Sequence, residues 1–277
     1  MKKTNATDLL ALNQAYLGRV SDKFGTEIRK KNSRMFCCGK VCSEIADYAI
    51  GDVHYYKFML ECDRNNNNTS DVIPVIIEKT KENAACNFLK FGKELTIIGS
   101  FRSNNFTDHS GKRHLDVFLQ ATDFAFGSMY SEAGFDSNIV VLKGYICTEP
   151  TFKVTQSKRY ISEFRIAVSN ENGEPDYIPV IVWGTKAVEV YQKYNVGDKL
   201  SLVGRVQSRR YYKKAQQEED KGESLIAYEV SSRYMRRTYV KDPDKPWREL
   251  KSNHPFPVRP IEFFVKQQCS LATVGAR

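Results

Sequence analysis

The side chains with the clearest potential for binding chemistry are two aromatic rings, Tyr177 and Trp183. They share one face of an extended chain, because successive side chains of a strand point to opposite faces. The opposite face carries Ile178, Val180 and Val182. At about 3.3 Å per residue the two rings are about 20 Å apart, which leaves room for separate bases. A stacked base contributes about 1 to 3 kcal/mol to single-strand binding, so this face is a candidate for holding nucleic acid.

Basic side chains alternate in the same way along the segment 199–212. Its inward face carries Leu200, Leu202 and Val206, and its outward face carries Arg205, Gln207, Arg209 and Tyr211. Further candidates for phosphate contacts are Arg165, Lys213 and Lys214. Alternatively, the rings pack against a neighbouring domain or subunit, and the arginines form a solvated edge that prevents self-association. For the two lysines the alternative is a flexible, solvated loop.

These side chains need strands to position them, and the second half of the chain contains five predicted strands with turn signals between them. They are Ile139–Ile146, Tyr160–Val168, Asp176–Trp183, Lys199–Tyr212 and Leu225–Tyr234. Between the third and fourth, apolar residues recur at helical spacing over Thr185–Tyr194, before a stop at Asn195-Val-Gly197. The pattern therefore predicts a five-stranded unit with one short helix.

The same pattern occurs earlier in the chain as an internal repeat. The sequence DVIPVII begins at Asp71 and DYIPVIV begins at Asp176, an offset of 105 residues. The offset also relates Gly39 to Gly144 and Gly99 to Gly204. In the first copy, the helix between the third and fourth strands is predicted at Lys79–Lys90. The chain is therefore predicted to be mainly all-β, with two copies of one fold.

Five strands with a helix between strands 3 and 4 suggest the oligonucleotide-binding fold (OB-fold), a small Greek-key barrel. The run Asn138-Ile-Val-Val-Leu-Lys-Gly144, the segment ending in Trp183-Gly184, and Gly197-Asp-x-Leu-x-Leu-x-Gly204-Arg together resemble the bacterial single-stranded DNA-binding protein family. The resemblance is specific from about 137 to 235 and fainter from about 33 to 124. It implies two tandem OB-fold barrels in one chain.

The resemblance implies that Tyr177, Trp183 and Tyr211 stack on bases of single-stranded DNA, independently of sequence, in replication, recombination or repair. The loop near 170–172 has no aromatic residue at a further stacking position of the family. Four barrels make the family's working unit, so a homodimer of this two-barrel chain is expected. RNA stays open as a ligand, because stacking does not distinguish the sugars. A second hypothesis, from another class, is an OB-fold adaptor that contacts proteins of a replication-restart or mobile-element complex.

The first copy has lost most of the stacking positions. Val72, Glu78 and Phe106 correspond to Tyr177, Trp183 and Tyr211, so one ring of three is kept and a carboxylate replaces the indole. A phosphate is repelled by that carboxylate. Weak binding is predicted for this copy, through Arg102, Phe106, Lys112 and Arg113. Its main expected role is to build the assembly.

Composition and repeat together predict five regions. They are an N-terminal helical or basic extension (1–32), a first OB-fold (33–126), a linker (127–136), a second OB-fold (137–240) and a proline-containing C-terminal tail (241–277). The tail holds five of the nine prolines and is expected to be extended and poorly packed. It lacks the acidic end with which the family recruits replication and repair proteins, so the resemblance does not carry these partners over, and they stay open as an alternative.

Charge is unevenly distributed over these regions. The 277 residues carry a net charge of +9, which favours polyanionic partners. Residues 33–126 hold 11 basic and 12 acidic side chains, whereas residues 137–240 hold 17 and 12. No apolar run approaches the length of a membrane span, and no secretory signal is evident, so a cytoplasmic, nucleoid-associated protein is expected.

The sequence offers little for catalysis, cofactors or metals. It has no phosphate-binding loop, no His-Glu-x-x-His helix and no Gly-x-Ser-x-Gly motif, so no enzymatic activity and no cofactor are expected. The cluster Cys37-Cys38-x-x-x-Cys42 lies in an apolar stretch and is interpreted as core rather than as a metal site. His109 and His114 flank the predicted turn Asp108-His-Ser-Gly111, which explains them without a metal nuclease.

Overall fold

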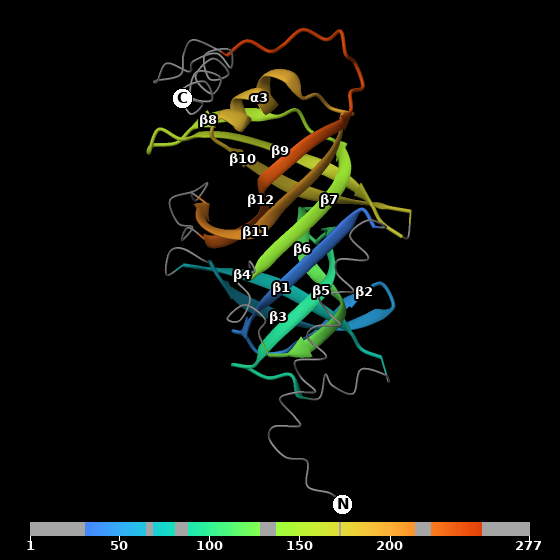
Figure 1. Cartoon of the computed structure of the whole chain (residues 1–277). Coiled ribbons are helices and arrows are strands. Elements are labelled where there is room, and N and C mark those ends of the chain that lie inside the picture. The colour runs from blue at the N-terminus through green and yellow to red at the C-terminus, as the bar shows by residue number, and fades with distance from the viewer. Residues whose placement is uncertain are drawn as a thin grey trace, which may run out of the picture.

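The computed structural model of the chain describes residues 31–64, 69–80, 88–127, 137–171, 173–213 and 223–250. Within these ranges the protein consists of twelve strands and one α-helix. The strands form two barrels that follow one another along the molecule (Figure 1). The fold is therefore mainly β, as the alternation of side chains predicts.

The first half of the chain forms a closed five-stranded barrel with one additional strand. Its elements are β1 (Ser33–Val41), β2 (Ala46–Ile50), β3 (Val53–Asp63), β4 (Ser70–Glu78), β5 (Glu94–Thr107) and β6 (Arg113–Phe126). Strand β1 pairs with both β3 and β5, β4 pairs with β3, and β5 pairs with β6. A parallel pairing of β4 with β6 closes the ring. The order β1-β3-β4-β6-β5 is the Greek-key order of an OB-fold.

The second half repeats this arrangement. Its elements are β7 (Asn138–Ile146), β8 (Thr151–Val154), β9 (Tyr160–Ser169), β10 (Pro175–Trp183), α3 (Thr185–Lys193), β11 (Lys199–Lys213) and β12 (Glu223–Tyr239). Strand β7 pairs with β9 and β11, β9 with β10, β11 with β12, and β10 runs parallel to β12. The helix lies between the third and fourth barrel strands, where the sequence predicts it.

The prediction of two five-stranded barrels is confirmed, with differences in detail. The five strands predicted in the second half are all present, and β12 extends to Tyr239, five residues beyond its predicted end. Two short strands, β2 and β8, were not predicted; they pair with β3 and β9 at the edges of the sheet. The helix predicted at 79–90 falls mostly outside the described residues, as do residues 1–30 of the N-terminal extension.

The two barrels are joined edge to edge by their first strands. Strand β1 runs antiparallel to β7, and the pairing places Met35 opposite Val140 (Figure 1). These two residues are also equivalent in the repeat, 105 positions apart, so an approximate two-fold axis passes between them. The arrangement has the self-complementary form of a symmetric dimer interface, here within one chain.

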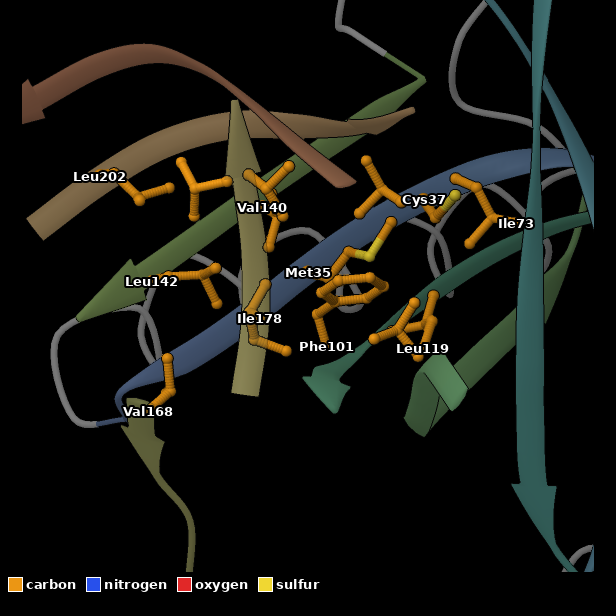
Figure 2. Packing of buried hydrophobic residues seen from close by; sticks show 14 of the residues in the cluster. Met35, Cys37, Ile73, Phe101, Leu119, Val140, Leu142, Val168, Ile178 and Leu202 are labelled. Atoms are coloured by element: carbon orange, nitrogen blue, oxygen red, sulfur yellow. The ribbon is translucent and has the colours of Figure 1, made fainter. Parts of the chain in front are cut away.

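A single apolar core runs through this junction. Met35, Phe101 and Leu119 from the first barrel and Val140 and Ile178 from the second belong to one buried cluster (Figure 2). Because burial of apolar side chains is the main stabilising term in folding, the two barrels support each other across β1 and β7.

One glycine pair of the repeat has a direct structural reason. A Cβ atom at Gly39 would overlap the carbonyl oxygen of Glu61, and one at Gly144 would overlap that of Ala167. At both positions the first barrel strand passes very close to the second one, and only glycine leaves room for the neighbouring backbone.

Residues 241–250 follow β12 and contain no helix or strand, but they are hydrogen-bonded to α3. The Arg248 backbone N–H donates to the carbonyl oxygen of Gln192 at 3.0 Å. Its guanidinium donates to the carbonyl oxygens of Tyr191 at 2.6 Å and Tyr194 at 2.8 Å. The last carbonyls of a helix have no partners within the helix, so Arg248 satisfies them. The start of the predicted tail is therefore irregular in conformation and, contrary to the prediction of poor packing, held against α3.

The described residues include no helix that is both long enough and apolar enough to cross a membrane.

Candidate nucleic-acid interface

Strand β10 presents Tyr177 and Trp183 on the outside of the second barrel, as the alternation predicts. Each of the two side chains is 37% exposed. Ile178 and Val182, which face the other way, are 0% and 2% exposed. Ile181 shares the outer face of the strand but is buried, so neighbouring side chains cover this position between the two rings.

The neighbouring strand β9 places a basic side chain between the two rings. Arg165 is exposed and lies opposite Pro179, whereas Ala167 lies opposite Tyr177. Directly opposed residues of an antiparallel pair share one face of the sheet. The structure therefore brings Tyr177, Trp183 and Arg165 onto one surface.

Strand β11 adds two arginines to this outer surface. Ser231 of β12 lies opposite both Ile181 of β10 and Arg205 of β11, so the three residues form a row across the sheet. Arg209 follows four residues later on the same face, with 58% of its side chain exposed. Aromatic and basic side chains thus alternate over β9, β10 and β11.

A carboxylate that was not predicted lies within this surface. Glu229 of β12 is 7% exposed and accepts a hydrogen bond from the Gln207 amide at 2.7 Å. The Nε of Arg209 is 3.8 Å from the same carboxylate oxygen. The alternation of the predicted strand 225–234 would place Glu229 outward, but only the register of β11 with β12 shows that it neighbours Arg209.

The remaining predicted contacts of the second barrel are only partly described. The backbones of Tyr211 and Lys213 belong to β11, opposite Leu225 and Glu223 of β12. The side chains of Tyr211 and Lys213, and the whole of Lys214, lie outside the described residues. Their contact roles stay predictions.

The corresponding surface of the first barrel is occupied by its own side chains. Glu78 lies opposite Tyr55 of β3, as Trp183 lies opposite Ile161 of β9, which supports the equivalence of Glu78 with Trp183. A small apolar cluster on this face is formed by Tyr55, Ile76 and Phe118, with Tyr48 and Ile50 of β2 packed against it. Val72, at the position of Tyr177, offers no ring. These features favour the prediction of weak binding by this barrel.

Polar side chains surround Tyr48 of β2 at the margin of that apolar cluster. The Nζ of Lys57 lies 4.1 Å from the centre of the Tyr48 ring and 3.5 Å from Asp116. The Tyr48 hydroxyl accepts a hydrogen bond from Asn104 at 3.4 Å. Burial raises the pKa of Tyr48. The rings of this face are therefore engaged within the protein.

Arg102, a predicted nucleic-acid contact of the first barrel, lies at the junction of the two barrels. Its Nε is 2.7 Å from Asp176 at the start of β10, and its Nη1 donates to Gln120 at 3.1 Å. Its side chain is 20% exposed and that of Asp176 is 2% exposed. The two residues line a hollow of about 430 Å³ between the barrels, together with Lys31 and Glu171, which form a second ion pair at 2.5 Å.

The other three predicted contacts of the first barrel gather at the hairpin between β5 and β6. The Phe106 ring, 43% exposed, stacks on His114 with ring centres 5.1 Å apart. Lys112 and Arg113 are exposed beside them. The turn is held by Asp108, whose carboxylate accepts from the Ser110 hydroxyl at 2.6 Å and lies 2.6 Å from His114 Nε2.

The hydrogen bond from the Ser110 hydroxyl, followed by the contact with His114, holds the pKa of Asp108 well below its usual range. The predicted turn is confirmed, and His114 serves it.

Two members of the cysteine cluster belong to the core, as interpreted from the sequence, whereas Cys42 is only partly buried. Cys37 and Cys38 are buried, and the Cys37 sulfur lies 3.0 Å from that of Cys62. Burial raises the pKa of Cys62 strongly. No group of three metal-binding side chains occurs among the residues whose positions are described.

Residues 137–232, which form most of the second barrel, match the model of the single-strand binding protein family. A single-stranded DNA-binding protein of Enterococcus faecalis is 31% identical over 99 residues, which cover 34% of this chain and 50% of that protein. One of Streptococcus mutans is 29% identical over 99 residues, covering 34% and 57%. The chain thus spans about half the length of the curated relatives it matches.

A solved structure resembles more of the chain than the second barrel alone. The wild-type single-stranded DNA-binding protein of Thermus aquaticus superposes with a TM-score of 0.56 at 16% sequence identity. The match covers 80% of this chain and 98% of that one. At this identity the likeness concerns the fold, and it agrees with the tandem arrangement of two barrels.

Proposed function

The chain belongs to the single-strand binding protein family through residues 137–232, and from this premise we propose that it binds single-stranded DNA without reading its sequence. The observation that carries the proposal is the joint exposure of Tyr177, Trp183 and Arg165 on one outer surface of the second barrel. Stacking tolerates any base, because every base has a flat aromatic face.

The single-stranded DNA crosses β9, β10, β12 and β11 with its bases toward the rings. Tyr177 and Trp183 each hold a base, and Tyr211 is proposed as a third stacking ring. Arg165, Arg205 and Arg209, with Lys213 and Lys214 beyond them, are proposed to contact phosphates. Duplex DNA binds poorly, because paired bases cannot offer their faces to rings on a sheet. The first barrel, through Phe106, Lys112 and Arg113, contributes a weaker contact.

In the cell this activity would protect or organise single strands during replication, recombination or repair. Two chains joined as a homodimer would present four barrels. Light scattering at micromolar concentration tests the assembly, and a monomer would refute it. The ligand is proposed to be DNA, and competition with an RNA oligonucleotide of the same sequence tests that choice.

The binding proposal is tested by titrating intrinsic tryptophan fluorescence with oligo-dT at two salt concentrations. The protein carries Trp247→Phe, because Trp247 is 55% exposed and would otherwise contribute to the signal. Quenching that weakens with salt is expected, since Trp183 stacks on a base while arginines hold phosphates. A folded protein with no quenching at Trp183 would refute the stacking surface.

Replacing Tyr177, Trp183 and Tyr211 with alanine separates DNA binding from a protein-adaptor role. At about 1 to 3 kcal/mol per stack, each single replacement weakens binding by roughly 5- to 150-fold. The triple variant is expected to lose measurable binding to oligo-dT by fluorescence anisotropy. Retained affinity in a folded triple variant would contradict the proposal and favour the adaptor hypothesis.

A further inference from the structure

Two serines related by the repeat connect the barrels in reciprocal fashion. Ser103 on β5 of the first barrel accepts a hydrogen bond from the Tyr177 backbone N–H at 2.8 Å. Its own N–H donates to the Asp176 carboxylate at 2.9 Å. Ser103 therefore fixes the backbone of β10 at the residue that carries the first stacking ring.

Ser208 on β11 makes the equivalent contacts in the other direction. Its hydroxyl accepts from the Val72 backbone N–H at 3.2 Å, and its N–H donates to the Asp71 carboxylate at 3.3 Å. The two serines are 105 residues apart, as are Asp71 and Asp176. The approximate two-fold axis thus gives each barrel a serine that holds the third strand of the other barrel.

The two junction contacts differ in what they hold and in how the aspartate is neutralised. The Ser103 contact holds Tyr177, an exposed ring, whereas the Ser208 contact holds Val72. Asp71 pairs with Arg64 of its own barrel, whose Nε donates to it at 2.8 Å. Asp176 instead takes its arginine, Arg102, from the opposite barrel. Only the contact at Tyr177 therefore depends on a charge pair between barrels.

That charge pair cannot be lost without consequence. The Asp176 side chain is 2% exposed, and an ionised carboxylate buried without a cation is strongly unfavourable. Burial raises the pKa of Asp176, against the opposing effects of the Ser103 N–H and the Arg102 guanidinium. Besides the pairing of β10 with β9, two residues of the first barrel thus hold Asp176, and with it the adjacent Tyr177.

We propose that Arg102 and Ser103 of the first barrel are positioning residues for Tyr177, so that the first barrel contributes to strand binding by ordering the ring of its neighbour. This inference rests on the function proposed for the second barrel. Arg102 is part-buried and engaged by Asp176 and Gln120, so its guanidinium serves the junction rather than a phosphate. A pre-ordered ring lowers the entropy cost of stacking.

The first test compares Ser103→Ala with Ser208→Ala in the full chain carrying Trp247→Phe. Each substitution removes one equivalent hydroxyl from the junction, so their effects on stability form a matched pair. Ser103→Ala is expected to weaken binding of oligo-dT by about 3- to 10-fold, because part of the stacking energy at Tyr177 is lost. Ser208→Ala is expected to stay within about 2-fold of the parent protein. Equal losses in both variants, or none in either, would overturn the inference.

A double-mutant cycle shows whether Ser103 acts through the ring. In a Tyr177→Ala background, Ser103→Ala should cause no further loss, because the ring that it positions is gone. An additive loss would refute positioning. The parent protein is the internal control. If it does not bind oligo-dT, the proposed function fails. If it binds oligo-dT but the losses caused by the two substitutions add up, only this inference is refuted.

Salt dependence distinguishes a positioning role of Arg102 from a direct contact between Arg102 and a phosphate. If Arg102 only positions, Arg102→Ala weakens binding at every salt concentration and leaves the slope of log K against log [NaCl] unchanged. If it contacts a phosphate, the slope becomes shallower by about 0.7. Adding Asp176→Asn should restore affinity to Arg102→Ala, since a neutral amide needs no cation and still accepts from Ser103. A shallower slope, or no restoration, would overturn the inference.

Discussion

Glu229 is the carboxylate beside Arg209 on the proposed binding surface, and its removal should strengthen binding. Within the described part of β11 and β12, it lies 3.8 Å from Arg209 and holds Gln207 by a hydrogen bond of 2.7 Å. A phosphate that approaches Arg209 must therefore compete with this carboxylate and is repelled by it. Glu229→Gln keeps the size and the hydrogen-bond acceptor but removes the charge.

The expected gain follows from the geometry. A phosphate oxygen bonded to Arg209 would lie about 2.8 Å beyond the guanidinium, hence about 6.5 Å from the carboxylate. Coulomb's law then gives a repulsion of about 2.6 kcal/mol at an effective dielectric constant of about 20, and about 0.6 kcal/mol in water. Arg209 is 58% exposed, so the lower half of this range applies, or roughly 3- to 15-fold tighter binding.

The assay is fluorescence anisotropy of labelled oligo-dT at several NaCl concentrations. Because Arg209 becomes available to phosphate, the slope of log K against log [NaCl] should steepen by up to about 0.7. Glu189→Gln on α3 is the matched control: Glu189 pairs with Lys186 at 2.8 Å, and its loss changes the net charge equally. If Glu229→Gln binds no more tightly than this control while keeping its unfolding temperature, the reasoning is wrong.

Three further predictions concern the framework around the surface. Gly144→Ala places a Cβ against the carbonyl oxygen of Ala167 and should destabilise the protein by about 1 to 3 kcal/mol; an unchanged urea midpoint would contradict this close approach. The lowered pKa of Asp108 means that its contribution to hairpin stability is present above the usual carboxyl pKa and is lost as the pH falls below it. Its carboxyl carbon should therefore still show the ionised NMR shift at about pH 3, where an ordinary aspartate is mostly protonated, and Ser110→Ala should raise the transition; a normal titration would refute the assigned hydrogen bonds. Arg248→Met removes charged hydrogen bonds to the end of α3 and should lower the free energy of unfolding by about 1 to 3 kcal/mol, measured by thermal denaturation, and no change would mean that this segment does not support the helix.

Local patterns in the sequence were sufficient to predict the barrel strands and their inward and outward faces. In β10, alternation places Ile178 inside and Tyr177 outside, because the two faces of a strand are set by its two-residue period whatever lies opposite. The repeat at an offset of 105 predicted the number of barrels, and one of its glycine pairs, Gly39 and Gly144, lies where the structure shows a close backbone approach.

The short strands β2 and β8 carried too little pattern to be recognised. Thr151–Val154 has only four residues and no fully buried side chain, so its pairing with β9 decides its conformation. The adjacency of Glu229 to Arg209 was equally hidden, because it depends on the register of two strands rather than on either strand alone.

The sequence by itself determined two barrels, the strands that compose them and the outward face that carries Tyr177 and Trp183. The tertiary structure decided that β1 joins β7 in one continuous sheet and that Arg102 serves Asp176 of the other barrel. The physical reason is that alternation and turn residues act between chain neighbours, whereas the partner of an edge strand or of a buried charge is chosen among groups far apart in the chain.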